Sequence, residues 1–172
     1  NLGNPYASNF RGRIGYLHAN YFWNNFMNYP ELNEFDYLMR IDDDSWFKSK
    51  LDFDFFDELD NRNGMFGTGF TWNHFNPNHL QTRHNLFNWI KYYVDKYNIN
   101  VKNEQLRESL NGPVDNELFH TLKWNCGNLN VYNREMFNTD SWKTYLNEFN
   151  ELAGGYRYRW GDCEVIGLYA YM

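Results

Sequence analysis

The sequence has few cysteines, no cluster of basic residues and no long apolar run, and each absence excludes a class of protein. Cys126 and Cys163 are its two cysteines, so neither a disulfide framework nor a four-cysteine zinc site can form, although a single bridge can. A net charge of −6 without clustered Lys and Arg argues against nucleic acid as a partner. No run of about eighteen apolar residues occurs, so we expect no membrane span.

Aromatic residues, in contrast, are abundant, at 21% of the 172 residues. Two interpretations stay open: an aromatic-rich core, or faces that stack on the apolar sides of pyranose rings. The length suits one domain with a real core, and we treat residues 1–172 as a single domain. Because the chain begins at Asn1 without Met, we expect it to be a fragment of a longer protein, and no signal peptide is visible in it.

Hydrophobic spacing predicts helices that alternate with short strands. The predicted helices cover residues 14–28, 85–97, 103–110 and 140–152, and a last one starts near Asp162; the predicted strands cover 36–42, 65–72 and 127–132. Pro30 and the pair Gly154 and Gly155 are expected to end helices. The alternation indicates an α/β domain with a mixed, mostly parallel sheet flanked by helices. Ligands of such sheets bind at the carboxyl ends of strands.

Three consecutive acids, Asp42, Asp43 and Asp44, follow the first predicted strand. In an extended segment the first and third side chains point the same way, so Asp42 and Asp44 could hold one hard cation between them. A cation held by one or two carboxylates keeps positions open for substrate phosphates. The alternative interpretation is a solvated acidic turn, which is a common feature of proteins.

A second polar segment covers residues 156–162, YRYRWGD, directly after the two glycines. Two Arg and one Asp among aromatic residues indicate either a loop that receives a polar ligand or an internal Arg–Asp pair that pins the loop. The five His residues are scattered without zinc-site spacing. The sequence contains no nucleophile elbow, phosphate-binding loop or dinucleotide fingerprint.

Both polar segments resemble those of the fungal α-1,2-mannosyltransferases of glycosyltransferase family 15. The stretch YPELNEFDYLMRIDDDSWF, residues 29–47, is similar to the family segment in which His-Pro-Leu-Leu, a Tyr-rich strand and Trp-Arg-Val-Glu-Pro follow in order. The stretch ELAGGYRYRWGDCEVIGLYA, residues 151–170, resembles the family's Gly-Gly-Phe-x-Tyr-x-Arg-Trp-Gly-Asp segment. The second match is the more specific, because many unusual residue types agree in order.

The resemblance implies a glycosyltransferase of GT-A fold, whose first strand and helix would lie before Asn1. It further implies GDP-mannose as donor, Mn²⁺ (or Mg²⁺) as cofactor, and transfer to a glycan or glycoprotein acceptor with retention of anomeric configuration. Members of the family act in protein glycosylation and are usually membrane-anchored in the Golgi or secretory lumen.

Site residues follow from the resemblance together with the chemistry above. We expect Asp42 and Asp44 to bind the metal and, through it, the diphosphate. Asp162 is expected near the acidic triplet, where it fixes a sugar hydroxyl or a neighbouring Arg, and Asn125 falls near the family's catalytic Glu, where an amide can touch the sugar without acting as a base. The expected substrate-binding residues are Arg40, Tyr158, Arg159 and Trp160.

One departure from the family leaves other functions open. Ile166 occupies the place of the family's metal-binding His, and we expect it to be buried and to contact no ligand. The first alternative is a transferase of the same fold that uses another nucleotide sugar. The second is an inactive, transferase-like domain that binds carbohydrate through its aromatic residues.

Overall fold

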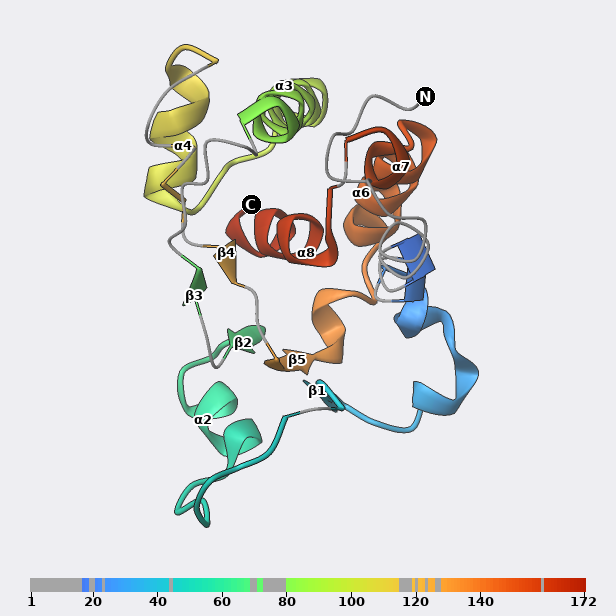
Figure 1. Cartoon of the computed structure of the whole chain (residues 1–172), viewed down its shortest axis with the longest axis vertical. Coiled ribbons are helices and arrows are strands. Elements are labelled where there is room, and N and C mark those ends of the chain that lie inside the picture. The colour runs from blue at the N-terminus through green and yellow to red at the C-terminus, as the bar shows by residue number, and fades with distance from the viewer. Residues whose placement is uncertain are drawn as a thin grey trace.

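The computed structural model describes residues 17–18, 21–22, 24–43, 45–68, 71–72, 80–114, 119, 121–122, 124–125, 128–158 and 160–172. Two small sheets are combined with helices in an α/β fold (Figure 1). The strands are β1 (Tyr37–Ile41), β2 (Phe66–Thr68), β3 (Thr71–Trp72), β4 (Trp124–Asn125) and β5 (Leu129–Asn133); the helices are α2 (Phe55–Asn61), α3 (Leu80–Tyr97), α4 (Glu104–Asn111), α6 (Asp140–Glu151), α7 (Gly154–Tyr158) and α8 (Asp162–Tyr171), with 3₁₀ turns η1 (Phe26–Asn28), η2 (Pro30–Leu32) and η4 (Arg134–Met136).

The larger sheet has the strand order β1-β5-β2, and both of its pairings are antiparallel. Strand β3 pairs with β4, also antiparallel, in a separate two-stranded sheet. The prediction of a mostly parallel sheet is therefore wrong for the described strands. Side chains alternate between the two faces in both kinds of sheet, so the hydrophobic pattern locates a strand without giving its direction.

The larger sheet is covered on both faces. On one face Leu38, Phe66 and Tyr132 pack into the hydrophobic core, with the rings of Phe66 and Tyr132 stacked 5.2 Å apart. On the other face lies α2, which contacts β5 and buries Leu59. Tyr37 on the edge strand β1 donates a hydrogen bond from its hydroxyl to Asp60 of α2. The sheet is thereby held between α2 and the main body of helices.

The core beyond the sheet combines aromatic side chains of α3 and α6 with aliphatic side chains of α8. Trp89 of α3 packs against Tyr145 and Phe149 of α6, with ring centroids 5.1 and 5.6 Å apart. Trp160, which precedes α8, stacks on Trp89 at 5.4 Å. Offset and edge-to-face pairs of this kind add to the hydrophobic stabilisation of burying large rings. For these residues, the interpretation that the abundant aromatic side chains form the core is confirmed.

Local sequence accounts for where several helices begin. Asp54, Asn103 and Thr139 precede α2, α4 and α6, and each side chain accepts a hydrogen bond from a backbone N–H of the first turn. Such caps satisfy donors that a helix start leaves without partners inside the helix. At α8 the Glu164 carboxylate accepts a hydrogen bond from the Gly161 N–H instead, at 3.0 Å.

The predicted helices at 85–97, 103–110 and 140–152 and the helix near Asp162 are confirmed within a few residues. The predicted strands at 36–42 and 127–132 are confirmed as β1 and β5, although β1 is an edge strand in which Ile41 is exposed, rather than a buried one. The predicted strand 65–72 is two short strands, β2 and β3, in different sheets. Of the predicted helix 14–28, the described part is helical at 17–18, 21–22 and 24–25 and ends in η1.

Other expectations concern single residues. Ile166 is 2% exposed in α8, which confirms its predicted burial. Cys163 is disulfide-bonded, so a disulfide, which the cysteine count of the sequence allowed, is present; Cys126 lies outside the described residues. Within the described ranges, no helix combines the length and apolar character needed to cross a bilayer.

Gly154 and Gly155 were expected to end a helix, but α6 ends at Glu151 and the two glycines begin the next helix, α7. Ala153 has a φ of 52°, a left-handed conformation that an L-residue adopts at a cost, and α7 then begins at Gly154. Gly154 is buried, and a Cβ built there would lie 2.0 Å from the Trp160 ring. The glycine is therefore required by the close approach of the indole, and the expected loop contains a short helix.

We predict that Gly154→Ala lowers the free energy of unfolding by about 1–3 kcal/mol, because the added methyl group must displace the packed Trp160 ring. Gly67→Ala is the control, since a Cβ at Gly67 meets only Leu59 at an ordinary contact distance of 3.6 Å. Urea unfolding followed by tryptophan fluorescence would measure both. Equal stability of the Gly154 variant and the wild type would contradict this account.

Candidate functional site

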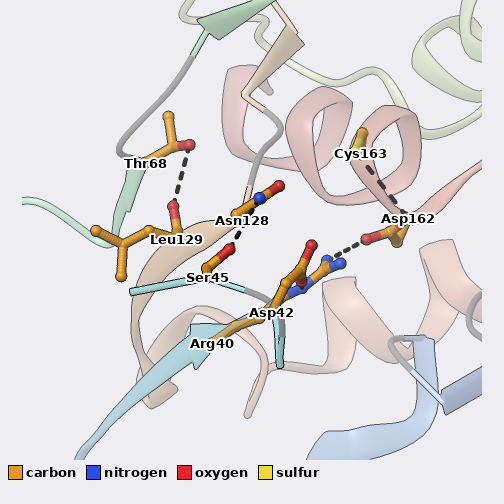
Figure 2. A network of polar contacts seen from close by, with 8 residues as sticks. All are labelled: Arg40, Asp42, Ser45, Thr68, Asn128, Leu129, Asp162 and Cys163. Atoms are coloured by element: carbon orange, nitrogen blue, oxygen red, sulfur yellow. Dashed lines mark hydrogen bonds and ion pairs between the residues drawn. The ribbon is translucent and has the colours of Figure 1, made fainter. Parts of the chain in front are cut away.

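A group of polar side chains gathers where strands β1, β2 and β5 meet at one end of the larger sheet. Since β5 runs antiparallel to its neighbours, the carboxyl ends of β1 and β2 lie beside the amino end of β5. The register places Arg40 opposite Asn130, and Asn130 opposite Thr68. Figure 2 shows Asp42, which follows β1, and Asp162, at the start of α8, on either side of Arg40.

Arg40 is the centre of this group because it pairs with two carboxylates. Its Nη1 donates to Oδ2 of Asp162, and its Nε lies 3.3 Å from Oδ1 of Asp42. The side chains of Arg40 and Asp162 are only 13% and 14% exposed, whereas that of Asp42 is 34% exposed. We call these three residues the Arg40 cluster. It links the end of β1 to the start of α8, 122 residues later in the chain.

The charges of the cluster explain why Arg40 can be buried. Burial by itself favours the neutral form of Arg40, but the nearby Asp162 and Asp42 carboxylates outweigh it and raise the pKa of the guanidinium. Two carboxylates facing one guanidinium leave the cluster with one negative charge in excess. Burial also raises the pKa of the neighbouring Tyr132 phenol, against the opposing effect of Arg40, so Tyr132 stays protonated at neutral pH.

Hydrogen bonds hold the segment that carries Asp42 against β5. The Asp42 N–H donates to the carbonyl oxygen of Asn128 at 2.9 Å, and the Ser45 N–H donates to that of Asp42 at 3.0 Å. The Asn128 amide then donates to the Ser45 hydroxyl at 2.9 Å. On the far strand, the Thr68 hydroxyl donates to the carbonyl oxygen of Leu129 at 3.4 Å. These bonds fix the turn after β1, and with it the position of the Asp42 carboxylate.

Asp162 is placed by α8. It is the first residue of that helix, where a negative side chain interacts favourably with the helix dipole. The next residue, Cys163, has its sulfur 4.0 Å from Oδ1 of Asp162. Because Cys163 is disulfide-bonded and its sulfur carries no proton, this is a packing contact. The helix start and the disulfide together restrict where the Asp162 carboxylate can lie.

Three of the predicted site residues come together in this way. Arg40, Asp42 and Asp162 form the cluster, and the expected closeness of Asp162 to the acidic triplet and to a neighbouring Arg is confirmed for Asp42 and Arg40. Asp44 and Arg159 lie outside the described residues. The roles of all of them in metal or substrate binding stay predictions.

Three other predicted site residues lie elsewhere. Asn125 is in β4, in the two-stranded sheet rather than beside Arg40 in the larger one. Trp160 is 2% exposed within the aromatic core, and Tyr158 lies beside it, with ring centroids 5.3 Å apart. Tyr158 and Trp160 line a pocket between α3 and α7 that contains no member of the Arg40 cluster.

Asn130, which the sequence did not indicate as a site residue, is 3% exposed on the central strand, opposite Arg40. The alternation of Leu129 and Val131 indicates one apolar face of the strand. It gives no sign that the opposite face, with Asn130 and Tyr132, is buried as well. Two Asn residues flanking Leu129 were the one available signal, because Asn is depleted in strands.

The fit of a metal ion depends on the carboxylates of this region. Among the residues that the structure describes, no three His, Cys, Asp or Glu side chains are grouped as metal ligands. Asp42 is nevertheless partly exposed and belongs to a cluster with excess negative charge. Mg²⁺ and Mn²⁺ are often held by one or two carboxylates together with substrate phosphates, so Asp42 fits as one ligand of such an ion.

Comparison with known proteins gives a clear likeness in fold. No known family profile and no curated protein sequence matches the chain. In contrast, the structure of core-mannan synthase A (CmsA/Ktr4) from Aspergillus fumigatus, in its Mn/GDP form, is similar with a TM-score of 0.76 over 97% of this chain and 46% of that one, at 17% identity. The fold is thus similar to that of a fungal mannosyltransferase.

Two structures of the mannosyltransferase Ktr4p from S. cerevisiae are similar too, both at 17% identity. The complex with GDP gives a TM-score of 0.71 over 91% of this chain and 41% of that one, and the second structure gives 0.70 over 99% and 48%. The chain therefore spans a little under half the length of each of these proteins.

We predict that Arg40 and Asp162 are energetically coupled. In a double-mutant cycle of Arg40→Met and Asp162→Asn, urea unfolding should give a coupling free energy of about 1–3 kcal/mol, because each single change leaves a nearly buried group without its partner. The exposed pair Arg62 and Glu58 on α2, 78% and 47% exposed, is the control and should give less than about 1 kcal/mol. Equal coupling in the two cycles would show that burial does not strengthen the Arg40 pair.

Proposed function

We propose that this chain is the sugar-transfer part of a metal-dependent glycosyltransferase of GT-A type. It would move mannose from GDP-mannose to a glycan or glycoprotein acceptor with retention of configuration. The observation that carries this proposal is the Arg40 cluster at the end of the sheet, in a fold similar to that of mannosyltransferases. The solved structures of two of these contain GDP, and one of them contains Mn as well.

The cluster is suited to binding a cation first, and then a diphosphate through that cation. Its excess negative charge would repel a diphosphate by itself but attracts a divalent cation. Asp42, the more exposed of the two carboxylates, would bind Mn²⁺ (or Mg²⁺), with Asp44 as the second expected ligand. When bound, the cation supplies positive charge to the diphosphate as it leaves the sugar.

Arg40 and Asp162 would act together on the substrate side. Arg40 holds Asp162 in one orientation at the start of α8. A carboxylate held in this way can accept a hydrogen bond from a sugar hydroxyl, and the guanidinium adds a positive charge beside the leaving group. Asn125 stays the predicted amide contact to the sugar, together with Arg159.

A second candidate function, a transferase-like domain that binds carbohydrate without catalysis, is favoured by one observation. Ile166, at the place where the resemblance puts a metal-binding His, is buried in α8 and cannot bind a metal. A divalent cation at this site would then depend on Asp42 and its neighbours. Metal-dependent turnover of any nucleotide sugar separates this candidate from the enzyme, including an enzyme that uses another donor.

The disulfide supports the compartment expected from the resemblance. Disulfides form and persist in oxidising environments such as the secretory pathway, and are rare in the reducing cytosol. The disulfide-bonded state of Cys163 is therefore consistent with a Golgi or secretory lumen.

The cation prediction can be tested by calorimetry of GDP binding with and without Mn²⁺. We expect Asp42→Asn, alone or with Asp44→Asn, to weaken Mn²⁺-dependent GDP binding by roughly tenfold or more, since each removes a negatively charged ligand. Asp43→Asn removes the same charge from the adjacent, exposed residue and should change the affinity by less than about twofold. Equal losses of GDP affinity at Asp42 and Asp43 would show that the total negative charge of the segment attracts the cation, and that Asp42 is not a specific ligand.

Asp162→Asn keeps the shape of the side chain and removes its charge. We expect mannose transfer from GDP-mannose to fall roughly ten- to a hundredfold, a barrier change of about 1.4–2.7 kcal/mol. Activity would be measured per folded molecule, with stability followed in parallel by thermal unfolding. A variant that loses stability but keeps its activity per folded molecule would make Asp162 structural. GDP binding without turnover of any sugar nucleotide by the wild type would favour the non-catalytic candidate.

A further inference from the structure

The pocket lined by Tyr158 and Trp160 has a volume of about 560 Å³ and opens between α3, α6 and α7, a volume within the range typical of small-molecule sites. Helix α3 contributes Trp89 and Tyr92, α6 contributes Glu148, and α7 contributes Arg157 and Tyr158. Residues of the Arg40 cluster do not line it. We call it the Trp89 pocket.

The floor and rim of the Trp89 pocket are aromatic. Trp89 and Trp160 form a stacked pair with centroids 5.4 Å apart, at an interplanar angle of 26°. Tyr158 packs beside Trp160, and Tyr92, at 56% exposure, presents its ring at the rim. Exposed aromatic rings next to buried ones give a ligand with flat apolar faces, such as a pyranose, surfaces to stack on.

Trp89 also carries a polar atom that calls for a partner. Its ring is 4% exposed, yet Nε1 has no acceptor among the described residues. Buried donors in native proteins nearly always have a hydrogen-bond partner, and an unmade bond costs about 1–3 kcal/mol. Because this nitrogen is itself buried, a ligand in the pocket meets the ring of Trp89 and does not reach its N–H.

The charges of the pocket balance and therefore indicate a neutral ligand. Lys96 and Arg157 are matched by Glu148 and Glu151, and Lys96 is ion-paired with Glu148. A phosphate or a nucleotide would meet no net positive charge here, unlike at a typical anion site. The groups present can instead donate to and accept from hydroxyls.

Glu148 stays available as an ionised acceptor. Its burial would raise the pKa, but hydrogen bonds from Lys96 and from the Tyr97 hydroxyl lower it. The Lys96 ammonium also lies over the rings of Tyr92 and Tyr97, 5.6 and 5.0 Å from their centroids. Cation–π contacts of this kind help to hold the rim tyrosines in place.

We propose that the Trp89 pocket is a binding site for a neutral sugar residue of a glycan chain, separate from the Arg40 cluster. The sugar ring stacks on Tyr92 and Tyr158. Glu148 and Arg157 bind other hydroxyls. This site does not depend on transfer activity, so it would serve an enzyme and a non-catalytic domain equally.

The test is a titration of the whole chain with methyl hexopyranosides and with neutral trisaccharides of mannose, glucose and galactose, followed by saturation-transfer NMR and calorimetry. We expect at least one trisaccharide to bind, and Tyr92→Ala to weaken its binding by roughly tenfold through loss of stacking. Arg157→Ala removes a side chain that can bind hydroxyls from the lining of the pocket, and should weaken binding by at least about threefold. The matched control is Tyr156→Ala, because Tyr156 is equally exposed at 57% and does not line the pocket; it should change the affinity by less than about twofold.

Tyr92 and Arg157 are both exposed, so we expect Tyr92→Ala and Arg157→Ala to fold. The proposal is overturned if no trisaccharide binds, if Tyr92→Ala and Tyr156→Ala act equally, or if the pocket binds GDP or a proline-rich peptide in place of sugars. Mn²⁺-dependent GDP binding, measured on the same variants, should be unchanged by Tyr92→Ala. A loss of GDP binding in that variant would show that the pocket is not separate from the Arg40 cluster, and would also overturn the proposal.

Discussion

Arg40 is a nearly buried guanidinium, and the arrangement of the site depends on how its charge is balanced. A buried charge is tolerated only when partners replace the water that it has lost. Asp162 and Asp42 provide that balance from two directions, one from the start of α8 and the other from the turn after β1. The pairing thus ties the sheet to the C-terminal helix and sets the direction in which both carboxylates point.

The same cluster gives the proposed function its chemical logic. A structural ion pair would be satisfied by one carboxylate, whereas here a second, more exposed one is present. The resulting excess of negative charge is the property that a cation-dependent diphosphate site requires. With Ile166 buried in α8, cation binding would rest on the acidic residues after β1 and not on a histidine of that helix.

The aromatic residues have two roles that composition alone could not separate. Many of those that the structure describes pack with one another in the core, chiefly from α3 and α6, and Gly154 lets the Trp160 ring approach the backbone closely. A few stand at the edge of this core, where Tyr92 and Tyr158 meet the charged residues of α6 and α7. The Trp89 pocket is therefore an open edge of the core, and the rigidity of the packed rings gives its floor a fixed shape.

Local sequence determined the position of most elements, because hydrophobic spacing and capping residues act over a few neighbours. It located α3, α4, α6, α8, β1 and β5, the burial of Ile166, and the acidic residues at the end of β1. Strand direction, the short helices α2 and α7, and the pairing of Arg40 with Asp162 were decided by contacts between distant segments. Asn130 shows the reason: its strand has the pattern of one apolar face, and only the helices packed on the other side bury the amide beside Arg40.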